Sequence, residues 1–203
     1  MTNRFSVALD RRKEVSSLAS WLARGVTRIV GWHFVGEPPG VPQYVLFGAP
    51  HTSGLDFLLL LALDFAFQIG AVWMGDEGLF RGPLGPVFRR LGGIPIDRSS
   101  RHNVVEQAVQ AFQHSERMVL VIAPEGARGR TKQWKTGFYY IALGADVPIV
   151  LGFMDYGLKN VGFGPMLMPS GDIEADMGII RGFYEDKEGK HPDRFVDVAD
   201  VIG

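Results

Sequence analysis

Short apolar runs alternate with longer segments of helical periodicity along most of this chain. An apolar run of about 4–8 residues indicates a buried strand, whereas apolar residues spaced three or four positions apart indicate a helix packed on a core. Strands that alternate with helices favour a layered α/β domain with a mixed, largely parallel central sheet flanked by helices. The expected strands are 44–47, 71–74, 94–96, 118–122, 148–153 and 161–168. The expected helices are 54–68, 87–91, 103–114, 136–143 and 173–184.

Composition limits the classes of protein to which the chain can belong. Its 203 residues fit one domain, and a hydrophobic content of 46% is enough to bury a substantial core. The absence of cysteine excludes disulfides, thiolate nucleophiles and thiolate metal sites, and it fits a cytosolic protein. A net charge of −1 gives no general attraction to nucleic acid, so we expect no nucleic-acid partner and only a local anion site. Residues 1–14 are polar and charged and lack the apolar core of a signal peptide.

An amphipathic helix is expected to precede the sheet, within residues 16–35. Its apolar positions at helical spacing are Leu18, Trp21, Leu22, Val26, Ile29 and Val30. Such a helix either lies in a membrane interface or packs its apolar stripe on the core of its own domain, and the pattern leaves both open. The more apolar stretch 57–73 is interrupted by Asp64, Gln68 and Gly70, so we expect a buried helix there and not a membrane span.

Prolines and a glycine within 37–42 separate two parts of the chain. Residues 1–42 are expected to form the N-terminal amphipathic helix and a linker, and residues 43–203 the main domain.

His51 and Asp56 are a candidate pair of general base and orienting carboxylate. An imidazole can take a proton from a hydroxyl, while a carboxylate on its other nitrogen fixes the tautomer. On one continuous helix, five residues turn about 500°, which would point the two side chains apart. They meet only if His51 lies in a loop and Asp56 in the first turn of the next helix, a layout that Pro50 and the cap-type residues 52–54 favour. The alternative is a structural or merely exposed histidine.

Arg98 and Glu125 each follow a predicted strand, as His51 does. In open α/β sheets ligands bind outside the carboxyl ends of the strands, so these residues suggest one shared site. Arg98 precedes a helix and could bind an anion, or it could pair with a nearby acid. Glu125, with Gly126 and Arg128 after it, could hold acceptor hydroxyls or the arginines; the alternative is an exposed charged loop.

Taken together, four motifs of the chain resemble those of the glycerophospholipid acyltransferase family, of the lysophosphatidic-acid acyltransferase type. They are His51-Thr52-Ser53-Gly54-Leu55-Asp56, Gly93-Ile94-Pro95-Ile96-Asp97-Arg98, Pro124-Glu125-Gly126-Ala127-Arg128 and Val147-Pro148-Ile149-Val150-Leu151. Their order and spacing agree with the family across roughly residues 45–155, and the four in order are specific where one alone is weak. Two positions depart from the family pattern: Ala127 replaces a threonine and Leu151 replaces a proline. Neither is a catalytic group of the family, so the departures put acceptor choice in question and not the reaction.

The resemblance implies acyl transfer from an acyl thioester, acyl-CoA or acyl-ACP, to the hydroxyl of a lysophospholipid. We expect 1-acylglycerol-3-phosphate as acceptor and phosphatidic acid as product, with His51 as general base and Asp56 as its orienter. The expected substrate-binding residues are Arg98, Glu125, Gly126 and Arg128. No metal is required, and the thioester donor is a substrate, so no cofactor is expected.

The resemblance also implies contact with a membrane surface through 16–35, which would place the protein in the cytoplasm, peripheral on the inner face of the membrane. Acyl carrier protein is a further candidate partner. The alternatives are an acyltransferase for another lipid acceptor, such as an acylated amino acid or a glycolipid, a thioester hydrolase, and a non-catalytic lipid-binding module on the same scaffold.

Overall fold

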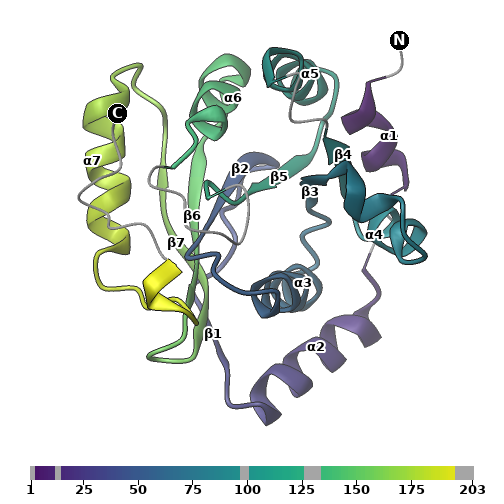
Figure 1. Ribbon diagram of the computed structural model, residues 1–203, viewed down its shortest axis with the longest axis vertical. Helices are drawn as coiled ribbons and strands as arrows, with labels where there is room; N and C mark the ends of the chain where they lie inside the picture. The colour runs from purple at the N-terminus through teal and green to yellow at the C-terminus, as the bar shows by residue number, and fades with distance from the viewer. Residues whose placement is uncertain (1–2, 12–14, 97–100, 126–133, 195–203) are drawn as a thin grey trace.

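The computed structural model describes residues 3–11, 15–96, 101–125 and 134–194. A seven-stranded sheet forms its centre, with helices on both faces, and this confirms the predicted α/β fold (Figure 1). The strands are β1 (His33–Val35), β2 (Gln43–Ala49), β3 (Val72–Asp76), β4 (Gly93–Ile96), β5 (Met118–Ile122), β6 (Ile149–Asp155) and β7 (Asn160–Leu167). Their order across the sheet is β1-β7-β6-β2-β5-β3-β4. The five strands from β6 to β4 are parallel, whereas β7 is antiparallel to β6 and pairs in parallel with β1.

Two hydrophobic clusters, one on each face of the sheet, hold the helices in place. The helices are α1 (Arg4–Arg11), α2 (Ser17–Ile29), α3 (Leu55–Phe67), α4 (Gly85–Arg90), α5 (Arg101–Gln113), α6 (Gly137–Ala145) and α7 (Ile173–Tyr184), with short 3₁₀ turns η1 (Glu77–Phe80) and η2 (Pro192–Arg194). Side chains of α1, α5, α6 and α7 belong to one cluster, and those of α3, α4 and η1 to the other. The alternation of β2 supplies both, because Val45 and Phe47 point into the first cluster and Tyr44 and Leu46 into the second.

The N-terminal segment differs in two respects from its sequence pattern. Helix α1 was not expected in so polar a stretch, yet Phe5 is buried under it against the core. The amphipathic segment is also not one helix to its end: α2 begins after the N-cap Ser16 and ends at Ile29. Gly31, with φ of +78°, then turns the chain, and β1 pairs with β7.

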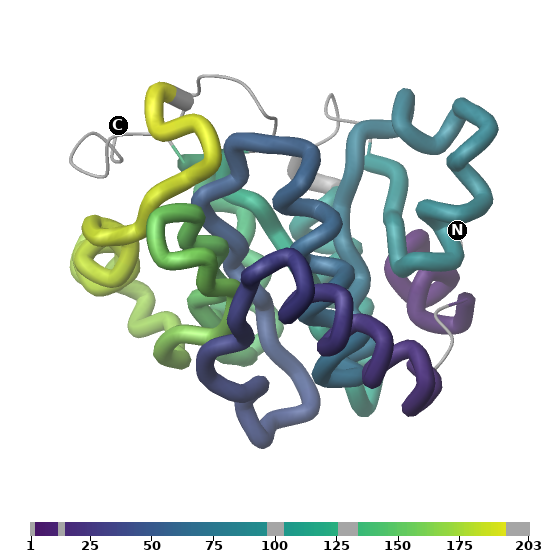
Figure 2. Tube along the Cα trace, turned by 90° about the horizontal axis from the view of Figure 1, so that it is seen from below, coloured from purple at the N-terminus to yellow at the C-terminus, as the bar shows by residue number. Residues whose placement is uncertain are grey.

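Helix α2 faces the domain with its polar side. The hydroxyl of Ser20 and the guanidinium of Arg24 both donate to the carbonyl of Ala66 in α3, each at 2.8 Å, and Arg24 also lies over the ring of Phe67. Figure 2 shows α2 as the outermost layer on this side of the molecule. Its apolar side chains are therefore exposed, with Trp21 at 70% and Ile29 at 85%. Of the described helices, none combines the length and apolar character that crossing a bilayer demands.

Candidate functional site

The junction between β2 and α3 brings His51 and Asp56 together. Strand β2 pairs in parallel with β5 and β6, so its end is fixed on both sides, and His51 follows it in a loop. Asp56 lies in the first turn of α3, as expected. His51 Nδ1 lies 3.4 Å from Asp56 Oδ2, and the imidazole is 23% exposed while the carboxylate is fully buried. This separation exceeds the roughly 2.6–3.2 Å of a tight hydrogen bond, so the two groups are in contact without a short hydrogen bond between them.

Both oxygens of the Asp56 carboxylate accept hydrogen bonds. The Ser53 backbone N–H donates to Oδ2 at 2.7 Å, and the Tyr156 hydroxyl donates to Oδ1 at 2.6 Å. Burial and the hydrogen bond to Asp56 raise the pKa of Tyr156. The position at the start of α3 also favours a negative charge through the helix dipole. The arrangement thus presents an oriented, buried carboxylate to the imidazole.

Glu125 joins the same site from the end of β5. Its side chain is buried, and Oε2 accepts a hydrogen bond of 2.7 Å from the His51 backbone N–H. Within the described part of the chain, Oε1 has no hydrogen-bond partner. Burial raises the pKa of Glu125 to about 8. The hydrogen bond from the His51 N–H lowers this pKa, and the negative charge of Asp56 raises it further. At neutral pH this carboxyl is therefore mostly protonated.

The structure brings three of the predicted site residues together and leaves three untested. His51, Asp56 and Glu125 meet where β2 and β5 end side by side. Three others, Arg98, Gly126 and Arg128, lie outside the described residues.

Tyr156 was missed, because it follows the last motif and reaches Asp56 only through the pairing of β6 with β2. The signal that could have found it is its place at the end of a buried strand, the feature that singled out His51 and Glu125.

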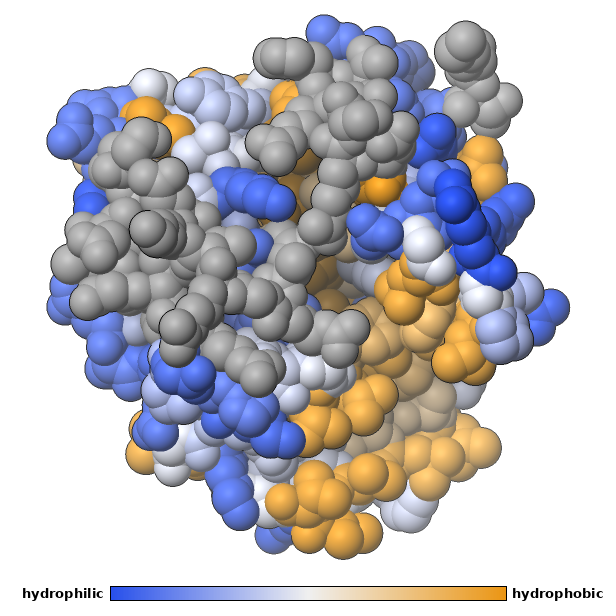
Figure 3. Space-filling view, viewed as in Figure 1, coloured by the Kyte–Doolittle hydropathy of each residue, from blue (hydrophilic) through white to orange (hydrophobic). Residues whose placement is uncertain are grey.

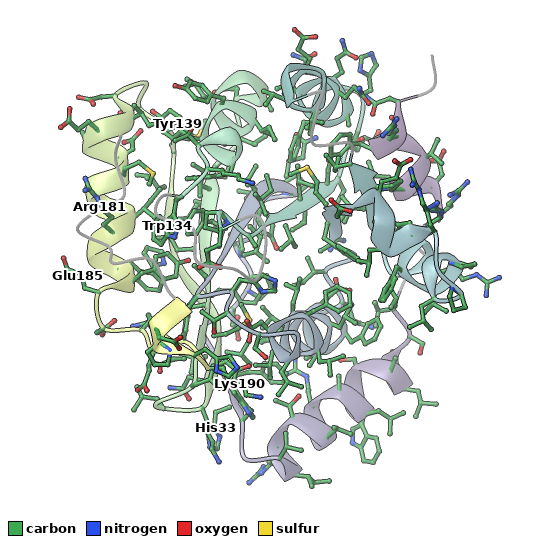
Figure 4. All side chains as sticks on the ribbon, viewed as in Figure 1. His33, Trp134, Tyr139, Arg181, Glu185 and Lys190 are labelled. Atoms are coloured by element: carbon green, nitrogen blue, oxygen red, sulfur yellow. The ribbon has the colours of Figure 1, made fainter. Side chains whose placement is uncertain are left out.

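An aromatic layer supports the site from behind. The Tyr184 hydroxyl, at the end of α7, shares its one hydrogen between the carbonyls of Gly152, at 2.7 Å, and Phe47, at 3.2 Å. It thereby bridges β2 and β6. Trp134 packs edge-on against Phe47 and Tyr184 and lies between the sheet and α7 (Figure 4). These contacts fix the strand from which His51 emerges.

The chemistry available at this site is proton transfer. A partly exposed imidazole oriented by a carboxylate can take a proton from a hydroxyl, and a neutral Glu125 can donate a hydrogen bond. Among the described residues there is no group of three or more histidines, aspartates or glutamates that could hold a metal ion.

Comparison with known proteins identifies a family and a similar fold. Residues 41–151, more than half of the 203, match the family described as Acyltransferase. The fold is similar to that of the crystal structure of the 1-acyl-sn-glycerophosphate (LPA) acyltransferase PlsC from Thermotoga maritima, with a TM-score of 0.54 and 15% sequence identity over 85% of this chain and 80% of that chain. At this identity the likeness concerns the fold alone. No curated protein matches the sequence.

Proposed function

Because the chain belongs to the Acyltransferase family, we propose that it transfers a fatty acyl chain from an acyl thioester to the free hydroxyl of a lysophospholipid. The proposed acceptor is 1-acylglycerol-3-phosphate, the product is phosphatidic acid, and the donor is acyl-CoA or acyl-ACP. The observation that supports this most directly is the contact of 3.4 Å between His51 and Asp56 at the end of β2, with Glu125 bound to the same loop.

In the proposed reaction His51 is the general base. Nδ1 faces Asp56, so Nε2 is the nitrogen that takes the proton from the acceptor hydroxyl. The hydroxyl oxygen attacks the thioester carbonyl carbon, a C–O bond forms, and the carbonyl oxygen becomes an oxyanion. Collapse of this intermediate breaks the C–S bond, and the imidazolium returns the proton to the leaving thiolate. Asp56 stabilises the imidazolium in between, and no enzyme thiol is needed.

Acceptor binding is assigned to the remaining motif residues. Arg98 and Arg128 are proposed to hold the phosphate, because a guanidinium can bind two of its oxygens at once. Glu125, together with Gly126, is proposed to position the glycerol. With its pKa raised to about 8 by burial, Glu125 keeps a proton at neutral pH, and Oε2 is engaged by His51. Oε1 is then the oxygen that can donate a hydrogen bond to an acceptor oxygen.

Membrane contact is proposed for the exposed apolar side of α2. We call its residues the α2 surface: Leu18, Trp21, Leu22, Val26, Ile29 and Val30, all exposed. Leu55 and Leu58 add exposed apolar side chains on α3, the helix that carries Asp56. Figure 3 shows hydrophobic residues gathered over the lower right of the molecule, where α2 and α3 lie. A protein that takes its acceptor from a bilayer gains from such a surface beside its site, and we propose a peripheral position on the cytoplasmic face of the membrane.

The decisive experiment measures thiol release and lipid products together. Purified protein is given acyl-CoA and lysophosphatidic acid in mixed micelles, thiol is followed with a thiol reagent, and products are identified by mass spectrometry. We expect one thiol for each phosphatidic acid formed. His51→Ala should lower the rate on the order of 100- to 10,000-fold. Arg98→Ala should mainly raise the KM for the acceptor.

The other outcomes separate the alternatives. Thiol release that needs no acceptor would identify a hydrolase. Turnover only with an acylated amino acid or a glycolipid would identify a different acyltransferase. If neither acyl-CoA nor acyl-ACP releases thiol with any acceptor, the domain binds lipid without catalysis.

A further inference from the structure

Tyr156 contacts the proposed catalytic pair although it lies outside all four sequence motifs. It follows β6 directly, in the turn that leads to β7. Its hydroxyl donates to Asp56 Oδ1 at 2.6 Å, shorter than the 2.7 Å bond of the Ser53 N–H to Oδ2. In the described part of the chain no other group donates to Oδ1. We infer that Tyr156 is a positioning residue for acyl transfer, acting through Asp56; this inference rests on the proposed function.

The tyrosine is held in place independently of Asp56. Its backbone N–H donates to the carbonyl of Glu188 at 2.8 Å. Its ring meets that of Trp32 edge-on, with centroids 4.8 Å apart and planes at 86°. Two segments distant in sequence, the turn before β1 and the loop after α7, therefore fix where the hydroxyl lies. The hydroxyl is thus positioned by contacts of its own, and together with the Ser53 N–H it orients the carboxylate.

The hydroxyl determines how the carboxylate meets the imidazole. Oδ1 is occupied by Tyr156, and Oδ2 receives the Ser53 N–H and faces His51 Nδ1. Without the hydroxyl, one oxygen of a fully buried carboxylate loses its donor, which is costly away from water. The carboxylate then turns toward another donor, which weakens its contact with Nδ1 and slows proton transfer, while substrate binding is unaffected.

A second buried tyrosine–aspartate hydrogen bond lies elsewhere in the molecule, and it does not involve His51. The Tyr139 hydroxyl in α6 donates to Oδ2 of the buried Asp176 in α7 at 2.8 Å. Burial and the hydrogen bond to Asp176 raise the pKa of Tyr139, as the corresponding contacts do for Tyr156. Tyr139→Phe is therefore the control: it removes a buried tyrosine–carboxylate hydrogen bond, and the bond that the Gly171 N–H donates to the same hydroxyl, from the core and none from the site.

The test is steady-state kinetics on the full chain with acyl-CoA and lysophosphatidic acid. Tyr156→Phe should lower kcat about tenfold and leave the KM of both substrates within about twofold. In an Asp56→Asn background, the same change should alter kcat less than about twofold, because the negative charge through which the hydroxyl acts is gone. Tyr139→Phe should lower the thermal midpoint and leave kcat within about twofold. Trp32→Leu keeps the hydroxyl but removes the ring contact, and should lower kcat by a smaller factor.

Three results would overturn the inference. They are an unchanged kcat in Tyr156→Phe, an effect that is equally large with Asp56→Asn, and a loss expressed in KM. If Tyr156→Phe does not fold, the Trp32→Leu variant with and without Asp56→Asn supplies the same comparison. Failure of the proposed function is a separate result: His51→Ala would retain turnover. Loss of turnover in His51→Ala combined with full turnover in Tyr156→Phe would reject the role of Tyr156 alone.

Discussion

The backbone N–H of His51 donates to Oε2 of Glu125 over 2.7 Å, so a buried carboxyl at the end of β5 holds the loop at the end of β2. The two strands are parallel neighbours, and the hydrogen bond closes the gap between them just beyond the last paired residues. Glu125 therefore has a structural contribution at the site besides any contact with the acceptor. Its ionisation should affect the stability of the fold.

Glu125→Gln should change how stability depends on pH. Burial raises the pKa of Glu125 from 4.5 to about 8 in the folded chain, whereas the unfolded chain keeps the ordinary value. Between these two pH values unfolding releases a proton, so the wild type loses stability as pH rises from about 4.5 to about 8. Glutamine still accepts from the His51 N–H and cannot ionise. Relative to wild type, the free energy of unfolding of the variant should rise by about 3 kcal/mol between pH 5 and pH 8.

Urea denaturation at pH 5, 6, 7 and 8 measures this difference. Glu116→Gln is the control, because Glu116 is exposed and its substitution should give a difference that is flat with pH. A flat profile for Glu125→Gln as well would mean that Glu125 does not stay protonated in the folded protein.

Asp56→Asn should lower catalysis by more than its effect on folding explains. The amide oxygen can accept from Tyr156 or from the Ser53 N–H, whereas the carboxylate accepts from both, so one hydrogen bond is lost. The substitution also removes the charge that stabilises an imidazolium, so kcat should fall on the order of 100-fold or more. Asp64→Asn is a matched control on the same helix, because Asp64 is also buried and accepts the Ala71 N–H at 2.9 Å. It should leave kcat within about twofold. Stopped assays of phosphatidic acid formation, with thermal melts of both variants, provide the comparison; equal kcat losses would point to a general defect of α3.

The central strands could be predicted from the sequence because they are buried on both faces. The residues of β5 and β6 are all buried, so they read as continuous apolar runs. In contrast, β1 has three residues with two of them exposed, and α1 is a short helix with charged residues at both ends. Both owe their structure to tertiary contacts, β1 to β7 and α1 to α5 and β4, which local sequence does not reveal.

The site residues also divide into those that local sequence predicts and one that depends on tertiary contacts. His51, Asp56 and Glu125 could be predicted because each follows or begins an element that the sequence already marked. Tyr156 is 100 residues from Asp56, and its contact depends on the register between β6 and β2. Periodicity likewise predicted the amphipathic character of α2 but not which side would face the domain. The carbonyl of Ala66, which binds Ser20 and Arg24, decides that.

The α2 surface should govern binding to lipid vesicles. The double substitution of Trp21 and Ile29 by glutamate puts two charges where apolar side chains would enter the membrane interface. The affinity for vesicles should therefore fall about tenfold or more. Flotation with vesicles of phosphatidylethanolamine and phosphatidylglycerol measures it. Ile179→Glu is the control, since Ile179 is also exposed, at 57%, but lies on α7, on the opposite face of the sheet. If the wild type, the double variant and Ile179→Glu float equally well, α2 does not mediate membrane binding.

Tyr184→Phe should destabilise the fold from behind the site. The phenol is fully buried, and its hydroxyl bonds the carbonyls of Phe47 and Gly152 on adjacent strands. Phenylalanine fills the same space, so the change isolates the hydrogen bonds, and the free energy of unfolding should fall by about 1–2 kcal/mol. Tyr140→Phe is the control, because Tyr140 is 51% exposed and its hydroxyl can bond water, and it should change stability by less than about 0.5 kcal/mol. Urea denaturation of both variants at pH 7 measures the difference. The Tyr184 hydroxyl joins β2 and β6, the strands that precede His51 and Tyr156. If Tyr184→Phe lowers the free energy of unfolding no more than Tyr140→Phe does, the pairing of these two strands alone holds His51 and Tyr156 in register.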